Sequence, residues 1–154
     1  MDEGVDYLLG SGEWFDPHPW FNVILPASTA AAYVTEVLAD LTVADVGPGP
    51  ILLYPMRRET LHMPLLRFPA EPVGYVFALL RTVPPGARVA AVVADNRRLY
   101  EAATALGGVR YPVDSVPFSA ADWRAHFGAA WENYDTAKQM YDPNRIFTSS
   151  QGVI

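Results

Sequence analysis

Apolar and polar positions follow one another along the chain in a pattern that predicts two helices among four strands. Apolar residues recur at steps of three and four over 28–41 and again over 87–106. This spacing predicts two amphipathic helices. Ser28 is predicted to be the N-cap of the first of these segments. Four short, almost wholly apolar runs are typical of strands: 20–25, 51–54, 73–83 and 109–113.

The order strand, helix, strand, strand, helix, strand predicts an α+β fold of the split βαβ (ferredoxin-like) type. In this fold an antiparallel sheet carries both helices on one face. We expect Pro55 to end the second strand and residues 57–72 to form a loop. Residues 1–19, which are acidic and contain three glycines, are expected to be an irregular lead-in, and residues 20–114 to form one α+β unit.

The pattern changes after residue 114 to a dense aromatic stripe. Ser119 and Asp122 predict a capping box that begins a helix, and Gly128 predicts a kink or two short helices in series. Pro143 is expected to end this helix, after which an extended tail follows. Residues 115–154 are therefore expected to pack on a surface that this chain does not contain. The stripe consists of Trp123, Phe127, Trp131, Tyr134 and Tyr141.

Composition and charge exclude several classes of protein. The 154 residues are 51% hydrophobic, which suits one domain with an ordinary core, and the absence of Cys excludes zinc ribbons, iron–sulfur proteins and thiol enzymes. The net charge is -6 and no basic residue precedes Arg57, so nucleic acid is not expected as a partner. Of 11 basic residues 10 are Arg, which hints at a GC-rich bacterial genome. No apolar run reaches the roughly 18 residues of a membrane span and no signal peptide is recognisable, so we expect a cytoplasmic protein.

Familiar catalytic and metal-binding motifs are absent. His18, His62 and His126 are far apart in the sequence and no HExxH accompanies them, so no metal site is expected. Neither GxSxG nor GxGxxG occurs. The Gly-Pro-Gly-Pro segment at 47–50 cannot cradle phosphate, because two of its four residues have no amide hydrogen. We therefore expect no catalytic residue in this chain.

Trp20 and Asn22 are two residues apart in the first predicted strand and so point to the same side of the sheet. An indole beside an amide can hold a flat heteroaromatic ligand by stacking and by hydrogen bonds to its edge. A second interpretation is that Trp20 belongs to the core and Asn22 caps the strand end. The pattern leaves both open.

Several motifs together resemble a known family. HPWFNVILPAS, GPILLYPM, YVFALLRT and DWRAHFGAAWENYDTAKQMYDPNRIF, in this order, are similar to the C-terminal third of cytokinin dehydrogenases. These are flavin enzymes of the vanillyl-alcohol-oxidase type that oxidise N6-isoprenoid adenines. The resemblance implies that Gln151 lies near the flavin ring. It also implies that the substrate pocket is lined by Trp20, Asn22, Tyr54, Pro55 and Leu80.

The resemblance further implies FAD as the cofactor and an N6-substituted adenine (cytokinin) as the ligand. It implies that residues 20–114 are the substrate-binding unit and that residues 115–154 pack on an FAD domain that this chain does not contain. In the family, the histidine that attaches FAD and the catalytic aspartate belong to an N-terminal domain that this sequence does not include. We therefore expect the substrate-binding part of an oxidoreductase, inactive unless a separate FAD-domain chain is supplied. Two other interpretations stay open: a stand-alone α+β module for a small ligand, which could be dimeric, and a gene remnant.

Overall fold

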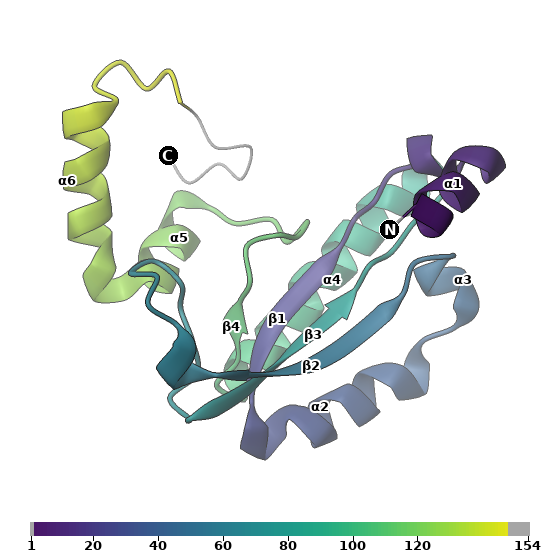
Figure 1. Cartoon of the computed structure of the whole chain (residues 1–154), viewed down its shortest axis with the longest axis horizontal. Helices are drawn as coiled ribbons and strands as arrows, with labels where there is room; N and C mark the ends of the chain where they lie inside the picture. Colours follow the sequence, from purple (N-terminus) through teal and green to yellow (C-terminus); the bar gives the residue numbers. More distant parts are fainter. Residues whose placement is uncertain (1, 148–154) are drawn as a thin grey trace.

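The computed structural model describes residues 2–147, and at its centre lies a four-stranded antiparallel sheet (Figure 1). Strand β1 pairs with both β3 and β4, and β2 pairs with β3, which gives the order β2-β3-β1-β4. Helices fill both crossovers, at 27–40 and 87–105, and the first crossover also contains the short α3 (Val43–Val46). This is the split βαβ arrangement, so the predicted fold class is confirmed. The strands are β1 (Phe21–Pro26), β2 (Ile51–Arg57), β3 (Val73–Leu79) and β4 (Val109–Arg110).

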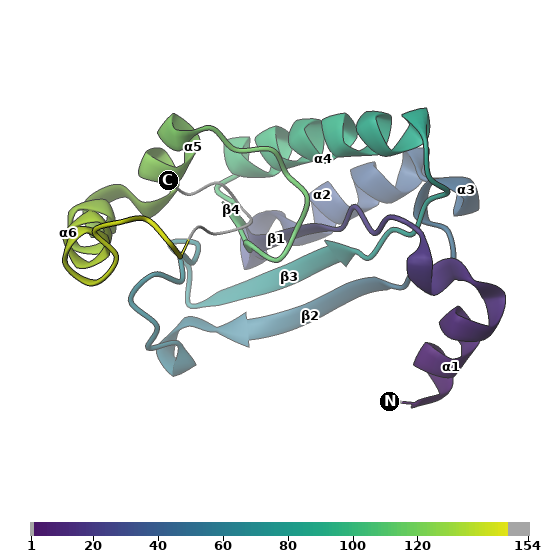
Figure 2. The ribbon, with the colours of Figure 1, turned by 90° about the horizontal axis from the view of Figure 1, so that it is seen from above.

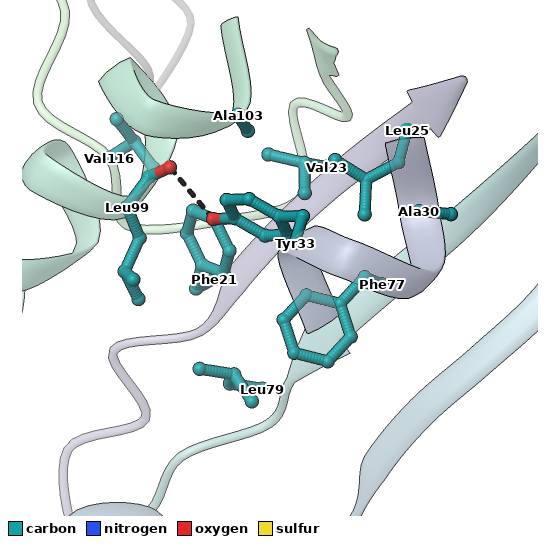
Figure 3. Close-up of a cluster of buried hydrophobic side chains, with 10 residues drawn as sticks. All are labelled: Phe21, Val23, Leu25, Ala30, Tyr33, Phe77, Leu79, Leu99, Ala103 and Val116. Atoms are coloured by element: carbon teal, nitrogen blue, oxygen red, sulfur yellow. Dashed lines mark hydrogen bonds between the residues drawn. The ribbon is translucent and has the colours of Figure 1, made fainter. Parts of the chain in front are cut away.

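Helices α2 (Ala27–Asp40) and α4 (Ala87–Ala105) lie on the same face of the sheet (Figure 2). Their apolar sides meet the inward residues of β1 and β3 in one core (Figure 3). At its centre the hydroxyl of Tyr33 donates a hydrogen bond to the Leu99 carbonyl oxygen at 2.8 Å, which satisfies a polar group that is fully enclosed. The core consists of Phe21, Val23, Leu25, Ala30, Tyr33, Phe77, Leu79, Leu99, Ala103 and Val116.

The strand register divides the sheet residues between two faces. Phe21 and Val23 face the helices, so alternation places Asn22 and Ile24 on the other side, which we call the helix-free face. Cross-strand partners share a face, and the register extends it over β3 and β2. The helix-free face consists of Asn22, Ile24, Leu52, Tyr54, Val76 and Ala78.

Strand β2 does not stop at Pro55, as the sequence predicts, but runs on to Arg57. The Leu80 N–H donates to the Pro50 carbonyl oxygen at 3.1 Å, and the Arg58 N–H donates to the Pro72 carbonyl oxygen at 2.9 Å. In the register between them, even-numbered residues of β2 exchange hydrogen bonds with β3, and odd-numbered ones turn their backbone groups to the outer edge. Pro55 is odd-numbered, so its missing N–H costs β3 no partner.

The lead-in is not irregular: helix α1 (Asp2–Ser11) and a 3-10 turn (Glu13–Phe15) occupy it. Gly12, with a φ of 81°, follows the last residue of α1 and begins the turn. Gly4 and Gly10 look like helix breakers in the sequence, yet both are tolerated within the helix. In Figure 2, α1 stands away from the sheet.

Three other local predictions are wrong in detail. Ser28 lies inside the first turn of α2, and its N–H and hydroxyl donate to Glu71 instead of capping the helix. The third strand stops at Leu79, and the N–H groups of Leu80, Thr82 and Val83 donate to carbonyl oxygens that lie outside any strand, those of Pro50, Val46 and Pro17. The fourth strand contains only Val109–Arg110, after which the chain turns so that Asp114 meets Arg110.

The C-terminal part agrees with the sequence up to residue 147. Ser119 and Asp122 form the predicted capping box of α5 (Ala120–Phe127). Gly128, with a φ of 52°, begins a 3-10 turn (Gly128–Ala130) that leads into α6 (Trp131–Tyr141), so the predicted kink is confirmed. Figure 1 shows α6 at the end of the molecule opposite α1. The division at 114/115 into two domains stays a prediction.

Candidate functional site

Trp20 directly precedes β1, and its backbone is held from two sides. Its carbonyl oxygen accepts hydrogen bonds from the Ser115 N–H at 2.8 Å and from Asn96 Nδ2 at 3.1 Å. The ring of His18 is tilted against the indole with 6.5 Å between the ring centroids. Trp20 is 36% exposed, so it is not a fully packed core residue and part of its ring remains accessible.

Asn22 lies within β1 on the helix-free face and is buried. The side-chain Nδ2 of Asn22 donates to the Val113 carbonyl oxygen at 2.5 Å. The backbone carbonyl oxygen of Asn22 accepts from the Tyr111 N–H at 3.3 Å. Because a carbonyl oxygen can only accept, the bond to Val113 determines which end of the amide is Nδ2. The Asn22 Oδ1 atom makes no hydrogen bond to another described residue, so it is available to accept one from a ligand.

Tyr54 extends the same face onto β2. It lies opposite Val76, which lies opposite Ile24, and it is 42% exposed. Partial burial and the neighbouring Tyr111 hydroxyl both raise the pKa of Tyr54, so its hydroxyl is protonated and can donate at neutral pH. The face therefore offers an acceptor on β1 and a donor on β2.

The remaining predicted pocket residues are not all on this face. Pro55 lies opposite Tyr75, which packs against the core under the helices, so Pro55 faces the helix side and not Asn22. Leu80 follows β3 directly and is half-buried. Alternation from Ala78 puts Leu80 on the helix-free face. Gln151, the predicted flavin contact, lies outside the described residues.

Two loops cover part of the helix-free face. A Cβ added to Gly74 would lie 2.8 Å from Phe68 Cζ and 3.0 Å from Ile24 Cγ2, so the 58–72 loop packs closely over one end. The segment after β4 covers Asn22 through Val113. Ile24, Val76 and Ala78 are buried, whereas Leu52 and Tyr54 on β2 remain exposed. The site is therefore an open surface beside β2 that a second surface would have to close.

Clefts of appreciable size lie elsewhere. One of about 400 Å³ lies between α2 and α4 and is lined by Arg81, Asp95 and Arg98, among others. Another, of about 750 Å³, lies beside the loop and strand ends at 57–61 and 70–73. Neither is lined by Trp20 or Asn22.

Sequence reasoning missed a buried polar network behind Trp20. Asn96, on α4, is fully buried and contacts Arg81, which is also buried. A signal was present in the spacing, since Asn96 lies four residues after Val92 and three before Leu99, on the buried side of the helix. A polar residue on that side requires internal hydrogen-bond partners.

A buried ion pair joins β4 to the segment that leads into α5. Arg110 and Asp114 have side chains that are 0% exposed, and Arg110 Nε donates to Asp114 Oδ1 at 3.0 Å. The Arg110 guanidinium carbon lies 4.0 Å from the Phe118 ring centroid and 4.5 Å from that of Trp123. Burial raises the pKa of Asp114, and the bond to Arg110 opposes this shift. The Arg110–Asp114 pair anchors the aromatic stripe. No motif in the sequence predicts this pair.

His126 belongs to the same aromatic cluster. Its ring lies among those of Phe118, Trp123 and Phe127. Burial, with a smaller contribution from the positive charges of Arg110 and Arg67, lowers its pKa to about 4. The imidazole is therefore neutral at pH 7. Among residues 2–147 with described positions, no group of three or more His, Asp and Glu side chains could hold a metal ion.

A salt bridge directs the chain at the end of α6. Asp142 accepts the N–H groups of Ile146 at 2.7 Å and Phe147 at 3.1 Å, and Lys138 donates to Asp142 and to the Phe147 carbonyl oxygen. The hydrogen bond from Lys138 lowers the pKa of Asp142. This turn determines the direction of the backbone at Ile146 and Phe147.

The described residues offer polar groups to a flat ring but do not fit the pyrophosphate of FAD. Asn22 Oδ1 and the Tyr54 hydroxyl could meet the polar edge of a flat ring. The Gly-Pro-Gly-Pro loop does not fit a pyrophosphate, because a Cβ at Gly49 would lie 1.5 Å from the Leu80 carbonyl oxygen and one at Gly47 would lie 2.2 Å from that of Thr82. Carbonyl oxygens of the protein thus occupy the space in which phosphate would need amide hydrogens.

Comparison with known proteins identifies what the chain is similar to. The family model described as "Cytokinin dehydrogenase 1, FAD and cytokinin binding" matches residues 4–154. An uncharacterized oxidoreductase, ORF5 in the fasciation locus of Rhodococcoides fascians, is 40% identical over 146 residues, covering 94% of this chain and 33% of that protein. Cytokinin dehydrogenase 5 of Oryza sativa subsp. japonica is 33% identical over 156 residues, covering 95% of this chain and 28% of that protein.

Cytokinin dehydrogenase 1 of Arabidopsis thaliana is 30% identical over 156 residues, again covering 95% of this chain but 26% of that protein. The chain thus spans about a quarter to a third of the length of these relatives. Within the described residues, no helix is both long and apolar enough to cross a membrane.

Proposed function

This chain belongs to the cytokinin dehydrogenase family, and we propose that it forms the substrate-binding side of a flavin-dependent oxidoreductase acting on N6-substituted adenines. The observation that carries the proposal is the orientation of Asn22, whose Nδ2 is bound to Val113 so that Oδ1 is left as an acceptor beside the partly exposed Trp20. An adenine with one N6 substituent keeps one N–H at N6, and Oδ1 could accept it.

We assign a distinct role to each residue of the site. The Trp20 indole supplies a flat apolar surface for the purine, and Leu80 contributes apolar area for the isoprenoid chain. Tyr54 can donate from its hydroxyl to a purine ring nitrogen. Pro55 supports the edge of β2 and has no ligand contact in this proposal, because it faces the helix side.

The proposal requires a second surface that carries FAD. When bound, FAD accepts the hydride that amine oxidation removes from the carbon beside N6. The residues of this chain bind the purine, orient its N6 side chain and exclude water from one side. We propose that an FAD domain, in the same longer protein or in a separate chain, packs on the helix-free face beside β2, where Leu52 and Tyr54 are exposed.

Ligand binding tests the proposal directly. Calorimetry with N6-isopentenyladenine would compare the wild-type chain with Trp20→Ala, and Trp14→Ala serves as the matched control because Trp14 is also exposed but lies in the lead-in. We expect Trp20→Ala to weaken binding at least about tenfold and the control to leave it unchanged. An unchanged affinity together with a loss of about 3–5 kcal/mol in the free energy of unfolding would mean that Trp20 is a core residue.

A chimera tests the oxidoreductase role. The matching segment of the Arabidopsis thaliana relative would be replaced by this chain, and reduction of dichlorophenolindophenol with isopentenyladenine would be measured. We expect turnover in the chimera, and a loss of turnover without loss of flavin absorbance when Trp20→Ala is added. A chimera that binds flavin but has no turnover contradicts the proposal.

The exposed apolar residues of β2 favour a second candidate, a stand-alone dimeric binding module. Light scattering and calorimetry distinguish the two. A stable dimer that binds isopentenyladenine without any flavin protein, and whose affinity is lost with the monomer, would favour the module.

A further inference from the structure

Asn96 connects the helix layer to the segment that carries Trp20. It is 0% exposed, and its Nδ2 donates to the carbonyl oxygens of Pro19 at 3.0 Å and Trp20 at 3.1 Å. Its Oδ1 accepts from Arg81 Nη1 at 2.9 Å. One buried amide therefore makes three hydrogen bonds, of which one ends on the backbone of Pro19 and one on that of Trp20.

These carbonyls need a side-chain partner because of where they lie. The segment 17–20 precedes β1, and β4 reaches only Val23 and Ile24, so no neighbouring strand supplies N–H groups at Pro19 and Trp20. The Ser115 N–H also donates to the Trp20 carbonyl oxygen, at 2.8 Å. Without Asn96, the Pro19 carbonyl oxygen would be buried with no described donor, which is unfavourable.

Arg81 fixes the orientation of the Asn96 side-chain amide. Arg81 bonds Asn96 through Nη1 and Asp95 through Nη2, the latter at 2.9 Å, so its guanidinium joins the buried amide to a carboxylate. Asp95 accepts from Arg98 on its other oxygen at 2.8 Å. Because Arg81 can only donate, the Asn96 atom facing it must be Oδ1, and Nδ2 must face the carbonyls.

We infer that Asn96 is a positioning residue for the ligand site: through the Asp95–Arg81–Asn96 network it holds the Trp20 backbone so that the indole is presented to the ligand. The ligand part of this inference rests on the proposed function, whereas the positioning of Trp20 does not. The site demands an amide, since one side must accept from Arg81 and the other must donate twice. A carboxylate would meet Arg81 equally well but oppose both carbonyl oxygens.

Fluorine NMR on the full chain labelled with 5-fluorotryptophan reports the position of Trp20. The chain has four tryptophans, and Trp20→Phe assigns the resonance of Trp20. We expect Asn96→Asp to shift or broaden the Trp20 resonance while those of Trp14 and Trp131 stay in place. Affinity for N6-isopentenyladenine is expected to fall about tenfold, which corresponds to about 1.4 kcal/mol.

Tyr33→Phe is the matched control, because it removes a buried hydrogen bond to the same helix, at Leu99. It is expected to lower stability while leaving the Trp20 resonance and the affinity unchanged. If Asn96→Asp does not fold, Asp95→Ala replaces it: Asp95 is 34% exposed at the outer end of the network, and a smaller displacement of the same resonance is expected.

Two results would overturn the inference: a Trp20 resonance unmoved by Asn96→Asp or its replacement, or one moved as far by Tyr33→Phe. A wild-type chain that binds no isopentenyladenine but whose Trp20 resonance moves in Asn96→Asp would contradict the proposed function and support the positioning role. Failure of the two ideas is therefore distinguishable.

Discussion

Strands β1 and β2 are similarly apolar in sequence, yet β1 is buried and β2 is exposed. All six residues of β1 are buried, whereas six of the seven residues of β2 are exposed. β1 lies between two strands with helices above it, and β2 lies at the sheet edge beyond the helices. An apolar sequence therefore indicates a strand, but the position of the strand in the sheet decides whether its side chains are buried. Apolar residues left exposed at the edge are consistent with a surface that meets a partner.

Truncating the core of β1 is the largest expected effect. Phe21→Ala should lower the free energy of unfolding by about 3–5 kcal/mol, because it leaves a cavity under α4. Leu53→Ala on β2 should cost less than about 1 kcal/mol, since half of that side chain is exposed. Urea unfolding measures both. Equal losses would show that β2 is packed against something in solution.

The two edge strands also end in different ion pairs. Asp114→Ala should cost about 3 kcal/mol, because it leaves the buried Arg110 without its carboxylate. Glu59→Ala removes the partner of Arg57 at 3.5 Å, where both side chains are about three-quarters exposed, and should change stability by less than about 0.5 kcal/mol. Chemical denaturation at pH 7 would compare them, and a small loss for Asp114→Ala would contradict the buried pair.

Lowering the pH should reduce the free energy of unfolding of the wild-type chain more than that of a variant without His126, which belongs to the aromatic cluster. The folded pKa of His126 is about 4, below the ordinary 6.5, so the unfolded chain binds the proton first as the pH falls. Stability from the neutral ring is complete above pH 6.5 and is lost as the pH falls towards 4.

Between pH 7 and pH 4 the wild-type chain should therefore lose on the order of 2 kcal/mol more than His126→Phe. Denaturation at a series of pH values measures the difference. Parallel curves for the two proteins would mean that the ring is not buried.

The smallest effect contrasts two tyrosines on opposite faces of the sheet. Tyr33→Phe should lower the free energy of unfolding by about 1 kcal/mol, because the Leu99 carbonyl oxygen loses its hydroxyl donor. Burial raises the pKa of Tyr33, so it donates this bond throughout the physiological pH range. Tyr54→Phe should leave stability unchanged and weaken isopentenyladenine binding. A stability loss at Tyr54 as large as at Tyr33 would contradict its placement on an open face.

Local features of the sequence determined most of the fold. Spacings of two and of three to four residues located β1, α2, α4 and the capping box at Ser119, and their order gave the split βαβ topology. These features depend on neighbours along the chain, so a sequence can reveal them. The placement of Trp20 and Asn22 on one side of β1 follows from the same alternation. The sequence also suggested the family, which the matching family model confirms.

Only the tertiary structure decided which side each remaining site residue faces and what holds it there. Pro55 faces the helix side because of the register between β2 and β3, and Arg110 is buried because Phe118 and Trp123 fold over it. Asn96 meets Trp20 across 76 positions of sequence. Such contacts depend on the path of the whole chain, and the balance of burial against hydrogen bonding at each is settled only when distant segments meet.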